Sequence, residues 1–235
     1  MDIGRTISYI FEDEKWVTKV LIGGLVLIIP IIGQLVLIGY MLKTAQNVAR
    51  GVERPLPEWG EFGDILMRGL YGLIISLVYM LPYIIVYVIF ACAMGGFSAA
   101  MEGNDDPSAL IGGLACIIMP IMLLLAFLGG LMSYAGWARY IATDQLSEAF
   151  KFGEVFAMLR SNLGLFLMAV VVVGILSGIV AMLGIIAIFI GVLFTSFIAY
   201  LMQGHALGQL TAKLFPMNQG YSAPTGDYSP PTIQL

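Results

Sequence analysis

The positions of charged residues divide the chain into four long apolar stretches. Asp, Glu, Lys and Arg are absent from Val20–Leu42, Gly69–Met101, Pro107–Ala138 and Ser161–Ala212. A helix needs about 20 apolar residues to cross a hydrocarbon layer of about 30 Å, so the second and third stretches each predict one transmembrane helix. The fourth stretch would form a helix of about 78 Å at about 1.5 Å per residue. We therefore expect it to fold into a hairpin.

The turn of this hairpin is expected near Gly184, between spans at Leu163–Leu183 and Ile185–Met202. The pattern predicts an all-α integral membrane protein with four transmembrane helices in two hairpins. The first apolar stretch is a fifth segment, and Pro30 and Gly33 interrupt its centre. Because proline removes a backbone hydrogen bond and kinks a helix, two alternatives are open. The segment is either a kinked span or a re-entrant hairpin whose ends lie on the same side.

The charges of the connections favour the re-entrant alternative. Bases are concentrated before the second and fourth stretches, whereas the connection Glu102–Asp106 has three acids and no base. Because bases gather on cytoplasmic loops, both basic segments and the C-terminus are predicted to be cytoplasmic in the cell membrane. If the first stretch crossed the membrane, Arg5, Lys15 and Lys19 would lie on the outer side, which is contrary to this rule. We expect four full spans and a re-entrant or steeply kinked first segment.

Two polar segments, before the second and the fourth stretch, resemble each other. The matching residues are Phe62, Gly63, Asp64 and Arg68 in the first and Phe152, Gly153, Glu154 and Arg160 in the second. We interpret each as an interfacial amphipathic helix, with phenylalanine in the acyl boundary and arginine at the headgroups. A duplication would give repeat-like units of about residues 55–136 and 145–213 within one membrane domain, residues 1–213. The alternative is convergence, because short interfacial helices favour these residue types.

A family resemblance is carried by motifs between Leu37 and Pro82. They are, in order, Gly39-Tyr40, Arg50-Gly51, Pro55-Leu56-Pro57-Glu58-Trp59, Phe62-Gly63-Asp64 and Tyr79-Met80-Leu81-Pro82. This order resembles the prokaryotic multi-pass membrane proteins of domain-of-unknown-function family 4013, over most of the chain up to about Lys213. The resemblance implies a small helical membrane protein of bacteria or archaea. It implies no assigned reaction and no catalytic residue.

Composition excludes several other classes of protein. Of the 235 residues, 60% are apolar before the 28 glycines are counted, and 11% are charged, whereas soluble domains have about 25% charged residues. A soluble enzyme, a nucleic-acid-binding module and a disordered chain are therefore excluded. The net charge of −4 provides no polybasic surface. Cys92 and Cys116 lie in apolar stretches and are interpreted as small packing residues.

Few residues suggest chemistry. His205 is the only histidine; it is a candidate haem or pigment ligand or proton relay, but the simpler interpretation is an interfacial residue at a helix end. Asn104-Asp105-Asp106 is interpreted as a turn rather than a cation site. The sequence contains no nucleophile–base pair, metal motif or cofactor fingerprint, and ionisable groups are missing from the middle of the predicted spans. We expect no enzyme, no metal and no cofactor.

Tyr79, Tyr83 and Tyr87 are spaced four residues apart around Pro82, so they share one face of the predicted second-stretch helix. Such a stripe either lines a binding groove or packs against neighbouring helices with its hydroxyls hydrogen-bonded. Packing is the more usual role of a tyrosine stripe. Pro82 predicts a kink or a hinge at this point.

We hypothesise a scaffolding or accessory subunit of a prokaryotic membrane assembly, with the bilayer and other membrane subunits as partners. Two small-residue faces, Gly174-x-x-x-Gly178 and Gly204-x-x-x-Gly208, suit close helix contact. The tail, residues 214–235, is rich in Pro, Gly, Ser and Tyr and is expected to dock a partner. The alternative is a transporter or lipid-handling protein with its site between the hairpins, near Tyr79 and Tyr83.

Overall fold

The computed structural model describes residues 2–100, 108–186 and 190–216, and every regular element in them is helical. The elements are α1 (Arg5–Phe11), α2 (Trp16–Val26), α3 (Ile32–Ala49), η1 (Trp59–Glu61), α4 (Phe62–Ala100), α5 (Ser108–Thr143), η2 (Leu146–Phe150), α6 (Phe152–Ser161), α7 (Leu163–Leu167), the π-helical turn η3 (Met168–Val172), α8 (Val173–Ile186) and α9 (Ile190–Leu214). The predicted all-α class is confirmed for these residues. The acidic connection Glu102–Asp106 and the tail from residue 217 lie outside them.

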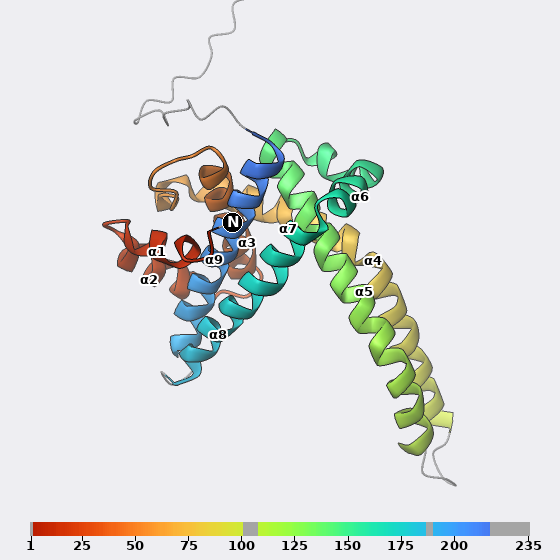
Figure 1. The fold of residues 1–235 in the computed structure, drawn as a ribbon. Helices are drawn as coiled ribbons and strands as arrows, with labels where there is room; N and C mark the ends of the chain where they lie inside the picture. Colours follow the sequence, from red (N-terminus) through yellow and green to blue (C-terminus); the bar gives the residue numbers. More distant parts are fainter. Residues whose placement is uncertain (1, 101–107, 187–189, 217–235) are drawn as a thin grey trace, which may run out of the picture.

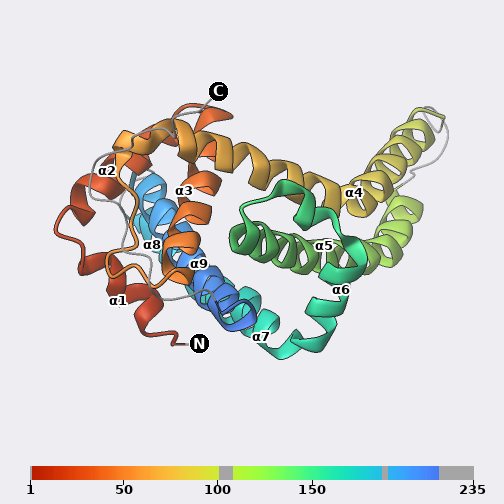
Figure 2. The same ribbon diagram turned by 90° about the horizontal axis from the view of Figure 1, so that it is seen from above.

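The long helices form two pairs that diverge from one end of the molecule (Figure 1). One pair is α4 and α5, and the other is α8 and α9. Helix α3 packs on both α4 and α9 and so joins the pairs, while α1 and α2 pack on α9. The short elements η2 and α6 pack on α5 near the end where the pairs meet (Figure 2).

Three segments of the described chain are long and apolar enough to cross a membrane. They are Trp59–Met94, Cys116–Thr143 and Leu163–Gly184, and they correspond to three of the four predicted spans. The fourth predicted span, Ile185–Met202, lies partly on α9, which is not one of the three, and partly on residues 187–189, outside the described chain. The structure therefore supports a membrane protein with three apolar helices of spanning length among the described residues.

The first apolar stretch is divided into α2 and α3 by a turn at residues 27–31. Pro30 lies in this turn, and the next residue, Ile31, has a φ of 68°. A positive φ costs a β-branched residue about 1–3 kcal/mol. The 11 residues of α2 extend over about 16 Å, which is shorter than a bilayer core. The break expected around Pro30 is therefore present.

Helices α3 and α4 touch backbone to backbone at two glycines. A Cβ added at Gly39 of α3 would overlap the carbonyl oxygen of Ile65, and one added at Gly69 of α4 would overlap that of Leu35. Any larger residue would push the helices apart. Glycine at these two positions therefore sets the distance between α3 and α4.

Helix α9 approaches α3 in the same way, through one of the two small-residue pairs. A Cβ at Gly204 would lie 2.7 Å from the carbonyl oxygen of Met41, and a Cβ at Gly208 would lie 2.6 Å from that of Ala45. Both distances are too short for a real Cβ contact. The Gly204-x-x-x-Gly208 face is therefore used inside the chain.

Buried apolar side chains form two clusters around α3. One joins α3 to α4, α5 and α6 and includes Leu42, Ile75 and Ile141. The other joins α3 to α1, α2 and α9 around Tyr40 and Phe197, whose ring centroids are 5.1 Å apart. Helix α3 therefore contributes to both halves of the core.

The start of the chain is hydrogen-bonded to α9. The backbone N–H of Asp2 donates to Oε1 of Gln209 at 2.7 Å, and Nε2 of Gln209 donates to the carbonyl oxygen of Asp2 at 2.9 Å. Residue 2 and the last part of α9 therefore lie at the same end of the molecule.

We predict that Gly39→Ala destabilises the protein by about 1–3 kcal/mol, because the added methyl group overpacks the contact with the Ile65 carbonyl. Unfolding in detergent micelles, followed by circular dichroism, measures the change. Gly63→Ala is the matched control, since its methyl group would meet open space and alanine favours helix. Equal stability of the two variants would contradict the close contact.

Candidate functional site

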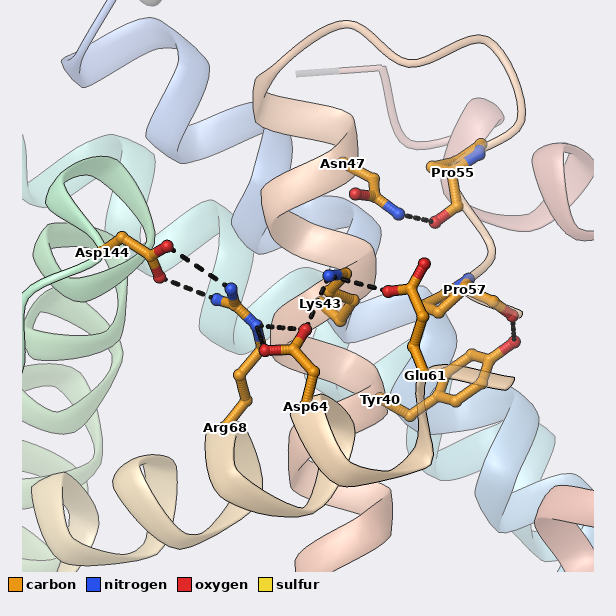
Figure 3. A network of polar contacts seen from close by, with 9 residues as sticks. All are labelled: Tyr40, Lys43, Asn47, Pro55, Pro57, Glu61, Asp64, Arg68 and Asp144. Carbon is orange, nitrogen blue, oxygen red and sulfur yellow. Dashed lines mark hydrogen bonds and ion pairs between the residues drawn. The ribbon is translucent and has the colours of Figure 1, made fainter. Parts of the chain in front are cut away.

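An ionic network joins α3, α4 and the residue after α5 where the helix pairs meet (Figure 3). Nζ of Lys43 lies 2.6 Å from Oδ2 of Asp64 and 2.9 Å from Oε2 of Glu61. Nε of Arg68 lies 3.0 Å from Oδ2 of Asp64, and Nη1 of Arg68 lies 3.0 Å from Oδ1 of Asp144. The network fixes three elements that are distant in the sequence.

Arg68 is the centre of this network. Its side chain is 9% exposed, whereas the side chains of Asp64 and Asp144 are about half exposed. Asp144 follows the last residue of α5 and has a φ of 56°, a conformation that Asp adopts more readily than most residues. Sequence reasoning named Asp64 and Arg68 as a local motif but missed Asp144, because no local pattern links positions so far apart.

The connection between α3 and α4 folds back onto α3. Three successive carbonyl oxygens of this connection accept side-chain hydrogen bonds: Pro55 from Asn47 at 2.9 Å, Leu56 from Lys19 at 3.0 Å and Pro57 from Tyr40 at 2.8 Å. Figure 3 shows the first and last of these bonds. The segment Pro55–Glu58, which we call the strap, is therefore anchored to α2 and α3 through its backbone.

Lys19 is a buried cation that the strap and α1–α2 connection enclose. Its side chain is 3% exposed, and Nζ lies 2.8 Å from Oδ2 of Asp13 and 3.0 Å from Oε1 of Glu58. Nζ donates hydrogen bonds to Asp13 and to the Leu56 carbonyl oxygen, and it forms an ion pair with Glu58. A fully paired buried lysine is a structural element, and sequence reasoning had used Lys19 only as a topology marker.

A second network joins α5 to η2 and α6. Nη2 of Arg139 lies 2.7 Å from Oε2 of Glu148 and 2.6 Å from Oε2 of Glu154. Nζ of Lys151 lies 2.6 Å from Oε1 of Glu148, and this hydrogen bond lowers the pKa of Glu148. This network holds the start of α6 against the end of α5.

The two similar polar segments start their helices in the same way. Phe62 is the first residue of α4 and Phe152 is the first residue of α6. Their side chains are 41% and 52% exposed. A Cβ added at Gly63 or at Gly153 would meet nothing within 4 Å. This likeness supports the repeat hypothesis, which stays a hypothesis.

The charged residues of the two segments differ in their partners. Asp64 pairs with Arg68 of its own segment, whereas Glu154 pairs with Arg139 from the preceding helix. Arg160, the arginine that follows the second segment, is exposed, and no partner for it is found among the described residues. Only the first segment therefore pairs its acid with its own arginine.

The tyrosine stripe on α4 divides into two parts. The hydroxyl of Tyr79 donates to the carbonyl oxygen of Ala149 at 2.6 Å. The ring centroids of Tyr79 and Phe152 are 5.4 Å apart, and the two rings form an edge-to-face contact. Tyr83 and Tyr87 instead stack on each other, with ring centroids 6.3 Å apart. Tyr79 is therefore a packing residue that joins α4 to η2 and α6.

Tyr83 and Tyr87 line an apolar groove between α4 and α5. Its volume is about 290 Å³, and Phe90, Met119 and Met122 contribute to its wall. Helix α4 contains Pro82 and bends along its length (Figure 2). The groove suits an acyl chain or another apolar molecule, because its lining is almost entirely hydrocarbon and aromatic.

His205 is buried between α9 and α1. Its ring stacks on the ring of Tyr9, with the two centroids 4.3 Å apart, and its side chain is 4% exposed. Nδ1 lies 3.0 Å from Nε2 of Gln209. Burial lowers the pKa of His205 to about 4, so the ring is neutral at physiological pH. The hydroxyl of Tyr9 donates to the carbonyl oxygen of Leu201, and burial raises the pKa of Tyr9.

The second small-residue pair faces open space. A Cβ added at Gly174 or at Gly178 of α8 would meet nothing within 4 Å, in contrast to Gly204 and Gly208. The described residues contain no group of three or more metal-binding side chains. The open glycine pair and the apolar groove are therefore two features that the contacts inside the described chain leave open.

A profile of proteins of unknown function, DUF4013, matches residues 22–192. The chain belongs to the DUF4013 family. The match extends from α2 to the start of α9 and includes the strap and the Arg68 network. The DUF4013 motifs before α4 therefore have a structural explanation, since Tyr40, Pro57 and Asp64 all hold α3, the strap and α4 together. No curated protein and no solved structure matches this DUF4013 chain.

We predict that Arg68→Gln destabilises the protein by about 1–2 kcal/mol, because it removes charge-assisted hydrogen bonds to two partly solvated carboxylates. Denaturant unfolding in detergent measures the loss. Arg160→Gln, at the arginine that follows the second segment, should change stability by less than about 0.5 kcal/mol. An equal effect of both variants would contradict the central place of Arg68.

Proposed function

We propose that this DUF4013 protein is a non-enzymatic scaffolding or accessory subunit of a prokaryotic membrane assembly and that α8 binds the other subunits. The observation behind this proposal is the contrast between the two small-residue pairs. Gly204 and Gly208 pack against α3, while Gly174 and Gly178 have no neighbour within 4 Å of an added Cβ. The pair on α8 is therefore available to a helix from another chain.

The rest of α8 also favours helix association. Ile175, Ile179 and Met182 are 60%, 53% and 66% exposed. Because lipid tails are as apolar as these side chains, burial alone does not drive two helices together in a bilayer. Close packing does, and open glycines allow the backbones to approach. The C-terminal tail remains a second proposed contact with partners.

We also propose four crossings and a first segment that does not cross. Asp2 and Gln209 are hydrogen-bonded to each other, which supports an even number of membrane crossings between them. The three apolar segments of spanning length together with α9 make four crossings. Helices α2 and α3 then form the re-entrant segment, and both ends of the chain face the cytoplasm, as the basic connections favour.

Reporters fused before residue 1 and after residue 235 are predicted to lie on the same, cytoplasmic side of the membrane. Alkaline phosphatase and green fluorescent protein fusions, which are active on opposite sides of a bacterial inner membrane, measure this directly. Termini on opposite sides would contradict both the Asp2–Gln209 contact and the re-entrant segment. If both termini were found on the outer side of the membrane, only the predicted orientation would be wrong.

Gly174→Leu and Gly178→Leu are predicted to remove co-purifying subunits without unfolding the chain, since each leucine would project into open space. Mild solubilisation followed by native mass spectrometry measures the stoichiometry. Gly164→Leu is the matched control, because Gly164 of α7 also has open space around an added Cβ. A wild-type chain recovered alone, or only with copies of itself, would contradict the accessory role.

A second candidate function is lipid handling or transport of an apolar molecule. The groove lined by Tyr83 and Tyr87 favours it. On this alternative, Tyr83→Phe alters the binding of a lipid or other apolar ligand in the same mass spectra, while subunit stoichiometry stays unchanged. Loss of subunits with unchanged ligand binding would instead support the scaffold.

A further inference from the structure

A polar cavity lies where α1, the end of α9 and the connection after α3 meet. Its volume is about 550 Å³, and its wall includes His205, Arg5, Lys213, Glu12 and Glu53. Most of these residues come from outside the part of the chain that the family profile matches. The cavity adjoins the strap at Pro55 and includes no residue of the Arg68 network.

The hydrogen bonds of Gln209 determine which nitrogen of His205 carries its hydrogen. Because the N–H of Asp2 donates to Oε1 of Gln209, the other end of the amide is the NH₂ group. This NH₂ group donates to the Asp2 carbonyl and lies 3.0 Å from Nδ1 of His205. An amide NH₂ group can only donate hydrogen bonds, so Nδ1 is the acceptor. The neutral ring therefore carries its hydrogen on Nε2.

This Nε2–H group has no acceptor among the described residues. The neighbouring hydroxyl of Tyr9 is already donating to the carbonyl oxygen of Leu201. The side chain of His205 is 4% exposed, but Nε2 is not among the fully buried side-chain atoms that lack a hydrogen-bond partner, so this nitrogen keeps some exposed surface. Since His205 lines the cavity, a ligand there with an acceptor oxygen would complete its hydrogen bonding.

The charges around the cavity have both signs. Arg5 and Lys213 are cations, and Asp2, Glu12 and Glu53 are carboxylates. No ion pair forms between these five side chains in the part of the chain that the structure describes. A simple anion would meet repulsion from three carboxylates, whereas a ligand that carries both charges would pair with both sets. Carboxylates accept hydrogen bonds from a primary ammonium but not from a quaternary one.

We propose that this cavity binds a phosphoethanolamine group, with its phosphate at Arg5, Lys213 and the Nε2–H of His205 and its ammonium at Glu12 and Glu53. Free phosphoethanolamine and the headgroup of phosphatidylethanolamine share this chemistry. A phosphate offers acceptor oxygens to all three donors at once. The cavity is a ligand site at the end of α9, independent of the subunit contact proposed for α8.

The single histidine makes the test direct. The full chain, purified without a histidine tag and labelled with ¹⁵N-histidine, is placed in nanodiscs of phosphatidylcholine and phosphatidylglycerol. Its ¹⁵N spectrum should show a neutral ring protonated at Nε2. A ring protonated at Nδ1 would overturn the proposal at its first step.

Three additions then identify the ligand. Replacing phosphatidylcholine by phosphatidylethanolamine, or adding soluble phosphoethanolamine, should shift the Nε2 resonance of His205. A response to the lipid alone identifies the lipid headgroup as the ligand. A response to the soluble molecule identifies free phosphoethanolamine as the ligand. Inorganic phosphate should act at least tenfold more weakly, because it lacks the ammonium. An equal response to inorganic phosphate, or no response to any addition, would contradict the proposal.

Variants assign the two charged sides of the cavity. Arg5→Gln and Glu53→Gln should each weaken the response about tenfold, as expected for the loss of one charge-assisted hydrogen bond. Arg160→Gln, far along the chain on α6, is the control and should respond like the wild type. Each variant must retain the wild-type spectrum in phosphatidylcholine, which shows that the ring environment is intact. An unchanged response in both Arg5→Gln and Glu53→Gln would overturn the assignment.

Discussion

Backbone contact at glycine holds α3 between α4 and α9, and the rest of the fold depends on this constraint. Apolar helix surfaces gain little by leaving lipid for one another, so association in a membrane relies on close packing. Gly39, Gly69, Gly204 and Gly208 provide that packing on two sides of α3. Once α3 is fixed, its polar end lies beside the strap and the start of α4.

The charged residues then fix the ends of the helices rather than their middles. Lys19 and Arg68 are buried, but both are fully engaged with carboxylates or carbonyl oxygens. A buried ion is tolerated only when it is paired and hydrogen-bonded, and these networks meet that condition where α2, α3, α4 and α5 come together. Arg139 repeats the arrangement at the start of α6. These paired charges therefore fix the ends of helices rather than their apolar middles.

The sequence was sufficient for those parts of the fold that depend on local composition. Stretches without charged residues correctly predicted three apolar helices of spanning length, and Pro30 correctly predicted the break before α3. The site depended on contacts that no local pattern contains. Tyr79 and Tyr83 belong to the same series of tyrosines spaced four residues apart, yet only Tyr79 donates a hydrogen bond to Ala149 of η2. In the same way, nothing local distinguishes Gly174 from Gly204, because the difference is the presence of α3 beside one of them.

This difference leads to the central claim, that the open face of α8 is a contact surface for other subunits. Photo-crosslinking in intact membranes tests it most directly, with a photoreactive amino acid placed at Ile179 on α8 and, for comparison, at the similarly exposed Leu123 on α5. The account predicts a protein adduct of discrete mass from position 179 and mainly lipid adducts from position 123. Lipid adducts alone from both positions would contradict it.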